Sequence, residues 1–290
     1  MPPVTPHSHI VLLQAHHLPE RVSWLIDHVS TQGVFVVVHV DAKATADFET
    51  CAAHFADARN VHFLDDPVKV NWSGFSQVRA TLKGIEWIRT HLPDFDYLHL
   101  LSGECLPLLP FVEIDKRLRT TLKGKDLIEC RLRPGYEWRI NRYNILGENP
   151  RNRQYYFVKA FKWVRDLQGP IAPRKNFPVD GIFFGSQWWS FRKASLERML
   201  ARDMNEFAKR FRWTRCADEH FFQILFAQAG LEAAGSHRYA DFQNAANPKY
   251  LLRNELFSAA EGGAFFARKV DLDTSKAFVE QLQVGGALRV

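Results

Sequence analysis

An adjacent pair of acids, Asp218 and Glu219, stands directly before an apolar segment of the chain. The apolar residues of that segment recur at helical spacing: Phe221, Phe222, Leu225, Phe226 and Ala229. Asp218 is suited to the N-cap of this helix, because its carboxylate can accept a hydrogen bond from an N–H of the first turn. Glu219 would then lie in the first turn, where a carboxylate facing a cleft can remove a proton from a bound hydroxyl. The alternative is that both acids only complement the helix dipole.

Polar residues also follow two predicted strands, at the point where each strand ends. Residues 34–40 form a continuously apolar run, which is typical of a strand covered on both faces. Ligands of open α/β sheets bind at the carboxyl ends of the strands. The candidates for a nucleotide pocket are therefore His39, Asp41 and Lys43. Ser102 and Gly103 begin a tight turn after another predicted strand, residues 97–101, and are further candidates for binding the nucleotide donor. For Asp41, a simple turn position is an equal alternative.

Two stretches combine features that could bind a sugar. Residues 131–153 contain six arginines, Arg142 among them, interleaved with aromatic side chains. This stretch could receive a sugar or an anionic acceptor, or it could be a solvated surface loop. Trp188 lies in a strand-turn-strand passage predicted over 181–191, where an aromatic face could stack on a sugar ring or pack in the core.

The order of the predicted elements favours an α/β fold. A strand at 9–15, a helix with apolar residues at i, i+3, i+4 and i+7 from Val22, and the strand at 34–40 make a β-α-β unit. Such crossovers are right-handed in nearly all proteins. Further strands are predicted at 61–64, 97–101, 127–129 and 237–242, and further helices after 76 and near 155–167, 193–201 and 248–256. We expect a mixed, mostly parallel sheet flanked by helices.

The composition is that of an ordinary globular protein, with 46% hydrophobic and 24% charged residues among 290. The formal net charge of +6 suits anionic ligands such as nucleotide phosphates or a membrane surface. Nucleic acid is not the expected partner, because the basic residues are dispersed and many aromatic residues lie in periodic apolar runs. The four cysteines form no C-x-x-C pair, so we expect no zinc site and no required disulfide.

No low-complexity linker divides the chain, so we predict a single domain over 1–290, with 276–290 as a C-terminal tail. The first nine residues have no apolar signal-peptide core, and no uninterrupted run of about 18 apolar residues is present. We therefore expect a cytoplasmic protein that would meet a membrane only peripherally, at its inner face.

Six short segments, spread over roughly residues 10–270, carry a resemblance to a known family. They are Val38-His39-Val40-Asp41-Ala42-Lys43, the run 70–76, the run 97–107, Gly185-Ser186-Gln187-Trp188, Asp218-Glu219 and Phe266-Ala267-Arg268-Lys269. In this order they resemble the core-2/I-branching enzymes, glycosyltransferase family 14, which include β-1,6-N-acetylglucosaminyltransferases and peptide O-xylosyltransferases. The resemblance implies a GT-A type glycosyltransferase fold, with a nucleotide-sugar-binding half at about 9–125 and an acceptor and catalytic half at about 126–275.

The resemblance also implies a reaction and the residues that perform it. The reaction is metal-independent, inverting transfer of GlcNAc or xylose from a UDP-sugar to a hydroxyl of a glycan or glycoconjugate. Glu219 takes the place of the catalytic base, and Asp41 falls in the region that contacts uridine. Arg238 and Lys269 match two cations that hold the diphosphate where related enzymes use a metal, although ordinary surface charge is the alternative for both. Glu129 is similar to an acid that contacts the acceptor.

The chemistry agrees with these roles. Attack on an anomeric carbon develops oxocarbenium character, and the acceptor hydroxyl needs a base to take its proton. The leaving diphosphate gains negative charge, which fixed cations stabilise. Trp188 and Arg142 join Glu129 as candidates for the acceptor site.

The chain departs from the secreted members of this family, which carry an N-terminal membrane anchor and many cysteines. This favours a bacterial enzyme that works on lipid-linked or nascent glycans. Asp271 and Asp273 have the spacing of a D-x-D metal motif, but they lie after the cationic segment. The competing hypothesis is a catalytically silent module that binds a UDP-sugar or a glycan without turnover.

Overall fold

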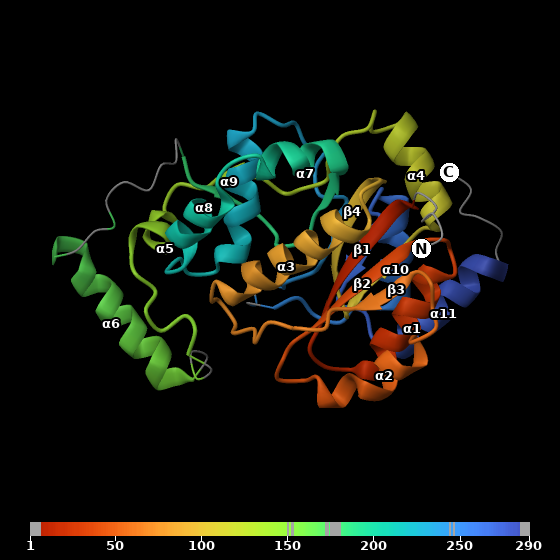
Figure 1. The fold of residues 1–290 in the computed structure, drawn as a ribbon, viewed down its shortest axis with the longest axis horizontal. Helices are drawn as coiled ribbons and strands as arrows, with labels where there is room; N and C mark the ends of the chain where they lie inside the picture. Colours follow the sequence, from red (N-terminus) through yellow and green to blue (C-terminus); the bar gives the residue numbers. More distant parts are fainter. Residues whose placement is uncertain are drawn as a thin grey trace.

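The computed structural model describes residues 7–149, 151, 154–171, 174, 181–243, 245 and 247–284. Arg153 and the last part of the predicted tail, 285–290, lie outside these ranges. The central sheet has the strand order β3-β2-β1-β4-β8, and Figure 1 labels the first four of these strands. Its strands are β3 Val61–Phe63, β2 Phe35–Val40, β1 His7–Ala15, β4 Phe95–Ser102 and β8 Ser190–Arg192. Only β8 runs antiparallel to its neighbour, so the prediction of a mixed, mostly parallel α/β sheet is confirmed.

Strand β1 is apolar on both sides because both faces of the sheet are covered. Its residues alternate between two cores: Ile10 and Leu12 face one, and Val11 and Leu13 face the other. The first core includes α3 Ser76–His91, α7 Lys193–Leu200 and α9 Phe221–Gln228. The second includes α1 Pro19–Ser30, α2 Glu49–His54 with the 3-10 turn η1 Ala46–Phe48, and α4 Phe111–Thr120. The sheet therefore fixes where the strand ends lie, and with them the residues that follow each strand.

A second, three-stranded sheet brings the C-terminal part of the chain back to the end of β4. Its order is β5-β10-β9, with β5 Cys105–Pro107, β10 Phe266–Arg268 and β9 Arg238–Tyr239. Strand β10 is antiparallel to β5 and parallel to β9. Helices α10 Arg253–Glu261 and α11 Leu272–Val284 share a third core with this sheet. The buried Arg21 of α1 also donates hydrogen bonds to the Val270 and Cys105 carbonyls, each 2.8 Å.

The remaining elements cover the other end of the molecule. They are β6 Arg131–Leu132, α5 Glu137–Asn141, α6 Tyr155–Ile171, β7 Phe183–Phe184, α8 Met204–Phe211 and the 3-10 turn η2 Ala217–Glu219. Strands β6 and β7 pair as a short antiparallel ribbon. Figure 1 shows α6 at one end of the molecule and α11 at the other. Among the described residues, no helix is long and apolar enough to span a membrane.

Four sequence predictions about elements are wrong. Residues 127–129 form no strand; Leu127 makes only an isolated bridge to Ser190. Helix α6 extends past the predicted end at 167 to Ile171. Residues 276–284 of the predicted tail belong to α11, because Phe278 is fully buried there.

The fourth wrong prediction concerns the acidic pair. Asp218 does not cap the apolar helix, because Cys216 adopts a left-handed conformation (φ 48°, ψ 54°) and residues 217–219 form the separate turn η2. Helix α9 begins only at Phe221, with His220 at its N-cap position. Glu219 therefore lies on a 3-10 turn before the helix and not in its first turn.

Candidate active site

The carboxyl ends of β1, β2 and β4 meet at one edge of the sheet, as the parallel register requires. Asp41, just after β2, is buried, and its Oδ1 accepts hydrogen bonds from the Lys43 and Val70 backbone N–H groups at 3.0 and 3.3 Å. The Lys43 ammonium lies 3.4 Å from Asp41 Oδ2. Asp41 thus joins its own turn to the loop that contains Val70. Its position is compatible both with the predicted turn role and with the predicted place in a pocket.

His39 serves the same loop from inside the sheet. Its ring is 2% exposed, and Nε2 accepts a hydrogen bond from the Val68 N–H at 2.9 Å. Burial, opposed by the nearby Asp41, lowers the pKa of His39 to about 4. His39 is thus a neutral support of the edge, with no open face for a ligand.

The turn after β4 packs closely against β1 and α1. The Gly103 N–H donates to the Gln14 carbonyl at 2.9 Å, and a Cβ on Gly103 would lie 2.7 Å from Val22 Cγ2. Ser102 Oγ accepts hydrogen bonds from the Glu104 N–H at 3.3 Å and from Arg268 Nε at 3.0 Å. Ser102 therefore faces β10, where the C-terminal cations lie.

Lys269 reaches this edge through a buried acid, Glu104, which the sequence did not single out. Lys269 Nζ lies 3.2 Å from Glu104 Oε2, while Glu104 Oε1 accepts a hydrogen bond from the Tyr250 hydroxyl at 2.5 Å and lies 3.7 Å from His17 Nε2. Burial raises the pKa of Glu104, but the Tyr250 hydrogen bond and the Lys269 charge outweigh it, so the pKa is below its usual value. Glu104 therefore already balances the charge of Lys269.

Arg268 is a second candidate residue that the sequence did not single out. Its guanidinium carbon lies 5.0 Å from the centre of the Trp188 ring, and its Nε bonds to Ser102. It makes no ion pair with a carboxylate in the described part of the chain. The available signal was its place beside Lys269 in the run 266–269, but only the register of β10 shows that it faces Ser102.

Arg238 is held deeper than Lys269, by different partners. Its Nη2 donates to the Trp189 carbonyl at 2.7 Å and to Ser190 Oγ at 3.1 Å, and its guanidinium carbon lies 4.6 Å from the Phe266 ring centre. Burial lowers the pKa of Arg238 to about 10. Its Nε and Nη1 are buried and have no partner among the described residues. Arg238 of β9 is paired with Phe266 of β10, and Phe266 lies two residues before Arg268 in the chain.

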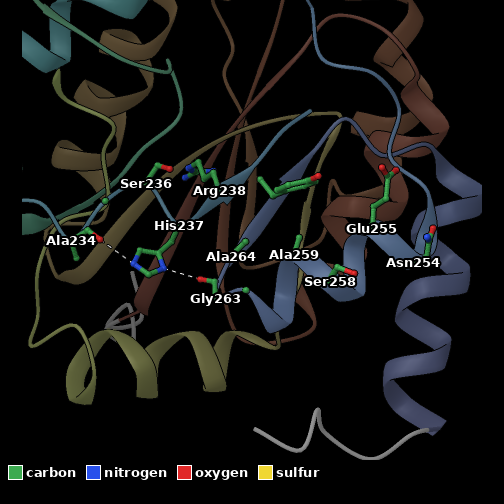
Figure 2. Close-up of a pocket in the computed structure, with 13 residues that line it drawn as sticks. Ala234, Ser236, His237, Arg238, Asn254, Glu255, Ser258, Ala259, Gly263 and Ala264 are labelled. Carbon is green, nitrogen blue, oxygen red and sulfur yellow. Dashed lines mark hydrogen bonds between the residues drawn. The ribbon is translucent and has the colours of Figure 1, made fainter. Parts of the chain in front are cut away.

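A cavity of about 450 Å³ is lined by residues of β9, Arg238 among them, by residues of α10 and by the loops beside them. Figure 2 shows His237 between Ala234 and Gly263, whose carbonyls lie 3.1 and 2.8 Å from its two ring nitrogens. Asp41, Ser102 and Glu219 are not among the described residues that line this cavity. Of the predicted site residues, Arg238 lines this cavity, so the cavity meets the candidate site at Arg238.

Glu219 stands on η2 with its side chain about one-third exposed. Its Oε2 forms an ion pair with Arg139 Nη1, whereas Oε1 accepts no hydrogen bond from the described residues. The guanidinium of Arg139 lies 4.5 Å from the Tyr136 ring centre and 5.5 Å from that of Phe184. Arg139 therefore holds one carboxylate oxygen and leaves the other available.

Asp218, the neighbour of Glu219, is buried and poorly satisfied. Oδ2 accepts one long hydrogen bond from Gln77 Nε2 at 3.4 Å, and Oδ1 has no partner among the described residues. Burial and the adjacent Glu219 raise the pKa of Asp218 to about 7. Asp218 is therefore the perturbed acid of the pair, while Glu219 is the accessible one.

Residues 185–188, here called the 185–188 segment, connect Glu219 with the cations. The Gly185 N–H donates to the Glu219 carbonyl at 3.0 Å. Gln187 Nε2 donates to Gln14 Oε1 at 2.8 Å, at the end of β1, and Trp188 lies under Arg268. The segment thus runs from the acid on η2, across the edge of the central sheet, to the guanidinium of Arg268.

Two of the predicted acceptor residues, Glu129 and Arg142, lie in different places. Glu129 Oε2 accepts a hydrogen bond from the Ser186 N–H at 3.1 Å, and its Oε1 pairs with the exposed Arg131 at 2.8 Å. Arg142 lines a separate hollow of about 390 Å³ with Trp138, Arg165 and Asp166. Glu129 therefore adjoins the 185–188 segment, whereas Arg142 lies toward α6.

The D-x-D spacing near the C-terminus has a structural explanation. Asp271 Oδ1 accepts a hydrogen bond from the Thr274 N–H at 2.8 Å, and Oδ2 accepts from the Thr274 hydroxyl at 2.9 Å. Asp271 thus caps the start of α11. No group of three or more potential metal ligands occurs among the residues that the structure describes.

Comparison with known proteins gives a family match and likenesses to solved structures. A family model described as Core-2/I-Branching enzyme matches residues 12–250. No curated protein matches the chain. Mouse xyloside xylosyltransferase 1 is 11% identical over 92% of this chain and 99% of that one, with a TM-score of 0.41. A 4-diphosphocytidyl-2C-methyl-D-erythritol synthase from Anaerococcus prevotii DSM 20548 is 11% identical over 88% and 97%, with a TM-score of 0.38.

The two structural likenesses are too weak to carry an argument, so the family match decides. It spans most of the chain and includes the edge residues Asp41 and Ser102 and the acid Glu219. The chain belongs to the Core-2/I-branching enzyme family and is a glycosyltransferase.

Proposed function

We propose that this glycosyltransferase moves GlcNAc or xylose from a UDP-sugar to a hydroxyl of a glycan or glycoconjugate, with inversion and without a metal. One observation carries the proposal: the 185–188 segment joins Glu219 at one end to Arg268 and Ser102 at the other. A single displacement needs a base for the attacking hydroxyl and positive charge for the leaving diphosphate. This segment supports both groups.

The donor is assigned to the sheet edge, with uridine toward Asp41 and the diphosphate toward the C-terminal cations. Lys269 is already paired with Glu104, so a diphosphate must share or displace that contact. Arg268 lacks a carboxylate partner in the described chain, and Arg238 has unpaired N–H groups. The two arginines therefore supply positive charge that is not already balanced, and a guanidinium can bind phosphate oxygens with two N–H groups.

The acceptor hydroxyl is assigned to Glu219 Oε1. As the hydroxyl oxygen bonds to the anomeric carbon, its proton passes to the Glu219 carboxylate. The bond between the anomeric carbon and the β-phosphate oxygen breaks at the same time, and UDP leaves with the bonding electrons. Because the nucleophile and the leaving group lie on opposite sides of that carbon, its configuration inverts. Trp188, Glu129 and Arg142 remain our candidates for contacts to the acceptor or the transferred sugar.

The test is Glu219→Gln, assayed as sugar transfer with a chelator present. Loss of the base should lower kcat by about 10²–10⁴-fold while UDP binding persists. The matched control is Glu137→Gln, an exposed acid on α5 near Arg139, which should keep full activity. Full activity of Glu219→Gln would reject the assigned base, and abolished wild-type transfer in chelator would reject the metal-free reaction.

The donor can be identified before the acceptor is known. UDP-GlcNAc, UDP-xylose and UDP should each be tested for a rise in melting temperature, since a ligand that binds only the folded state stabilises it by mass action. Transfer or slow release of UDP from the stabilising donor would distinguish an enzyme from a silent binding module. The cytoplasmic location and the peripheral membrane contact stay predictions.

A further inference from the structure

A buried chain of hydrogen-bonded side chains leads from Arg238 to the surface of α4. Arg238 Nη2 lies 3.1 Å from Ser190 Oγ, and Ser190 Oγ lies 2.8 Å from His99 Nδ1. His99 Nε2 lies 2.9 Å from His9 Nδ1, and His9 Nε2 lies 3.1 Å from Asp115 Oδ1. Four strands and one helix contribute one group each, so the chain is a product of the tertiary fold.

The chemistry of the two ends fixes the direction of every bond. An ionised Asp115 only accepts, so the N–H of His9 must be on Nε2. A neutral His9 then accepts through Nδ1 from the Nε2–H of His99, and His99 accepts through Nδ1 from the Ser190 hydroxyl. Ser190 oxygen accepts in turn from Arg238, which only donates. Each bond therefore runs from the buried cation toward the acid.

The surroundings favour the protonation states that this direction of the hydrogen bonds requires, which are neutral His99 and His9 and an ionised Asp115. His99 is fully buried, and burial together with His9 and Arg238 lowers its pKa well below the usual value. Burial also lowers the pKa of His9 in spite of Asp115. Partial burial raises the pKa of Asp115, but hydrogen bonds from Arg119 and the contact with His9 outweigh it and leave it below its usual range.

Aromatic walls keep water and alternative partners away from the middle of the chain. The rings of His9 and His99 stack at 5.2 Å, and Phe111 meets each of them edge-on at 5.6 Å. Phe266 lies 5.4 Å from His99 and also under the guanidinium of Arg238. Hydrogen bonds in such a water-poor interior strengthen one another and leave few other arrangements.

We infer that Ser190, His99, His9 and Asp115 are positioning residues that orient Arg238, so that its unpartnered Nε and Nη1 face an anionic group of the donor. The inference rests on the proposed function, because it takes the diphosphate as the anion that Arg238 binds. Nη2 is held by Ser190 and by the Trp189 carbonyl, and these two contacts fix the plane of the guanidinium. The remaining N–H groups are buried and unsatisfied until an anion arrives, and such groups are costly to leave without a partner.

The experiment compares binding of UDP with binding of uridine by calorimetry. Ser190→Ala should weaken UDP binding by about tenfold, since one hydrogen bond to a charged group is lost, and should leave uridine binding unchanged. A general packing defect would weaken both ligands together. The matched control is Ser195→Ala, another buried serine, whose hydroxyl bonds to Asp126 at 2.6 Å and not to Arg238. It should leave the ratio of the two affinities unchanged.

Two further variants separate the inference from its premise. Arg238→Ala must itself weaken UDP relative to uridine; if it does not, the diphosphate role of Arg238 fails and the inference fails with it. If Arg238→Ala has the effect but Ser190→Ala does not, only the positioning chain is overturned. In the Arg238→Ala background, Ser190→Ala should add no further loss, because the two residues then act as one unit.

Asp115 lies at the surface end of the hydrogen-bonded chain, where we expect a substitution to leave the fold intact. Asp115→Asn keeps an acceptor for His9 but removes the charge, so UDP should bind about threefold more weakly with uridine unaffected. This variant provides the measurement if Ser190→Ala does not fold. An unchanged ratio of UDP to uridine affinity in Asp115→Asn and in every folded Ser190 variant would overturn the proposal.

Discussion

Glu219 shares its carboxylate with Arg139, and this pairing decides how the acid can act. Oε2 is taken by the guanidinium, so only Oε1 can meet an acceptor hydroxyl. Arg139 is in turn held over Tyr136 and Phe184. In the proposed reaction the base must be oriented within hydrogen-bond reach of the acceptor proton, and Arg139 would supply that orientation.

We predict that Arg139→Gln lowers kcat by about 10–100-fold while UDP binding is unchanged, because the base loses its orientation but the donor loses no contact. Arg139→Lys should recover part of the activity through its remaining charge. Arg133→Gln is the control, since Arg133 is exposed and lies over the same Tyr136 and Phe184 rings without touching Glu219. Equal losses in Arg133→Gln and Arg139→Gln would show that the rings, and not the ion pair, matter.

Asp218 makes the stability of the fold depend on pH in a direction that can be tested. Its pKa is raised in the folded state, to about 7, so the folded protein keeps a proton that the unfolded chain releases near pH 4. The contribution to stability is therefore complete below about pH 4 and is lost as the pH rises through about 7. Asp218→Asn is always neutral and should be more stable than the wild type by about 1–3 kcal/mol at pH 8.

Urea unfolding of Asp218→Asn and the wild type at pH 5 and pH 8 would check this sign. The difference should be small at pH 5, where Asp218 is largely protonated in the fold, and larger at pH 8. Asp203→Asn is the contrasting variant, because Asp203 is exposed and its side chain accepts hydrogen bonds at the start of α8. A larger gain for Asp218→Asn at pH 5 than at pH 8 would contradict the assignment.

At the scale of elements, the 185–188 segment depends on one glycine. A Cβ at Gly185 would lie 1.7 Å from the Glu129 carbonyl oxygen and 2.6 Å from its carbon, so the backbone would have to move. The same residue donates its N–H to the Glu219 carbonyl. Gly185→Ala should therefore displace both η2 and the 185–188 segment, lowering activity by more than tenfold and stability by about 1–3 kcal/mol. Gly124→Ala, where a Cβ meets nothing within 4 Å, should affect stability through its positive φ (67°) but leave kcat unchanged in the folded protein.

The sequence predicted well the elements whose apolar residues form a long continuous run or recur at regular helical spacing. Strand β2 is a run of apolar residues buried on both faces, and α1 shows its buried stripe at Val22, Leu25, Ile26 and Val29. Strands of two or three residues, such as β7 and β9, are too short for a periodic pattern to identify. Their pairing partners lie far along the chain, so their existence depends on tertiary contacts.

The site was predictable only in part, for the same reason. Asp41, Ser102 and Lys269 do lie at the edge that parallel strands create, and Glu219 faces outward beside the 185–188 segment. The positions of Arg238 and Arg268 follow from the register of β9 and β10, which no local pattern contains. The predicted cap role of Asp218 was wrong because the left-handed Cys216 is a backbone feature without a sequence signal.

At the scale of the whole molecule, the C-terminal helix is part of the core. Phe278 of α11 is fully buried and packs 4.7 Å from the Phe257 ring, in the core that α10 and β10 share. Phe278→Ala should lower the free energy of unfolding by about 3–5 kcal/mol, as large core truncations do. Phe242→Ala, at a half-exposed phenylalanine, should cost far less in the same denaturant titration. Equal effects would mean that α11 is not packed as described.

The middle position of β10 in the three-stranded sheet determines which of the two sheets can form first during synthesis. Strand β10 lies between β5, near residue 106, and β9, near residue 238, and it carries Arg268 to Ser102. A growing polypeptide emerges from the ribosome amino end first, at about 5–20 residues per second. The nascent chain can complete its five-stranded sheet once β8 has emerged, but β5 and β9 must wait for β10, which lies between them. A translation product that stops before residue 268 would resemble the finished protein in its larger sheet and yet lack Arg268 and Lys269, two cations of the proposed site.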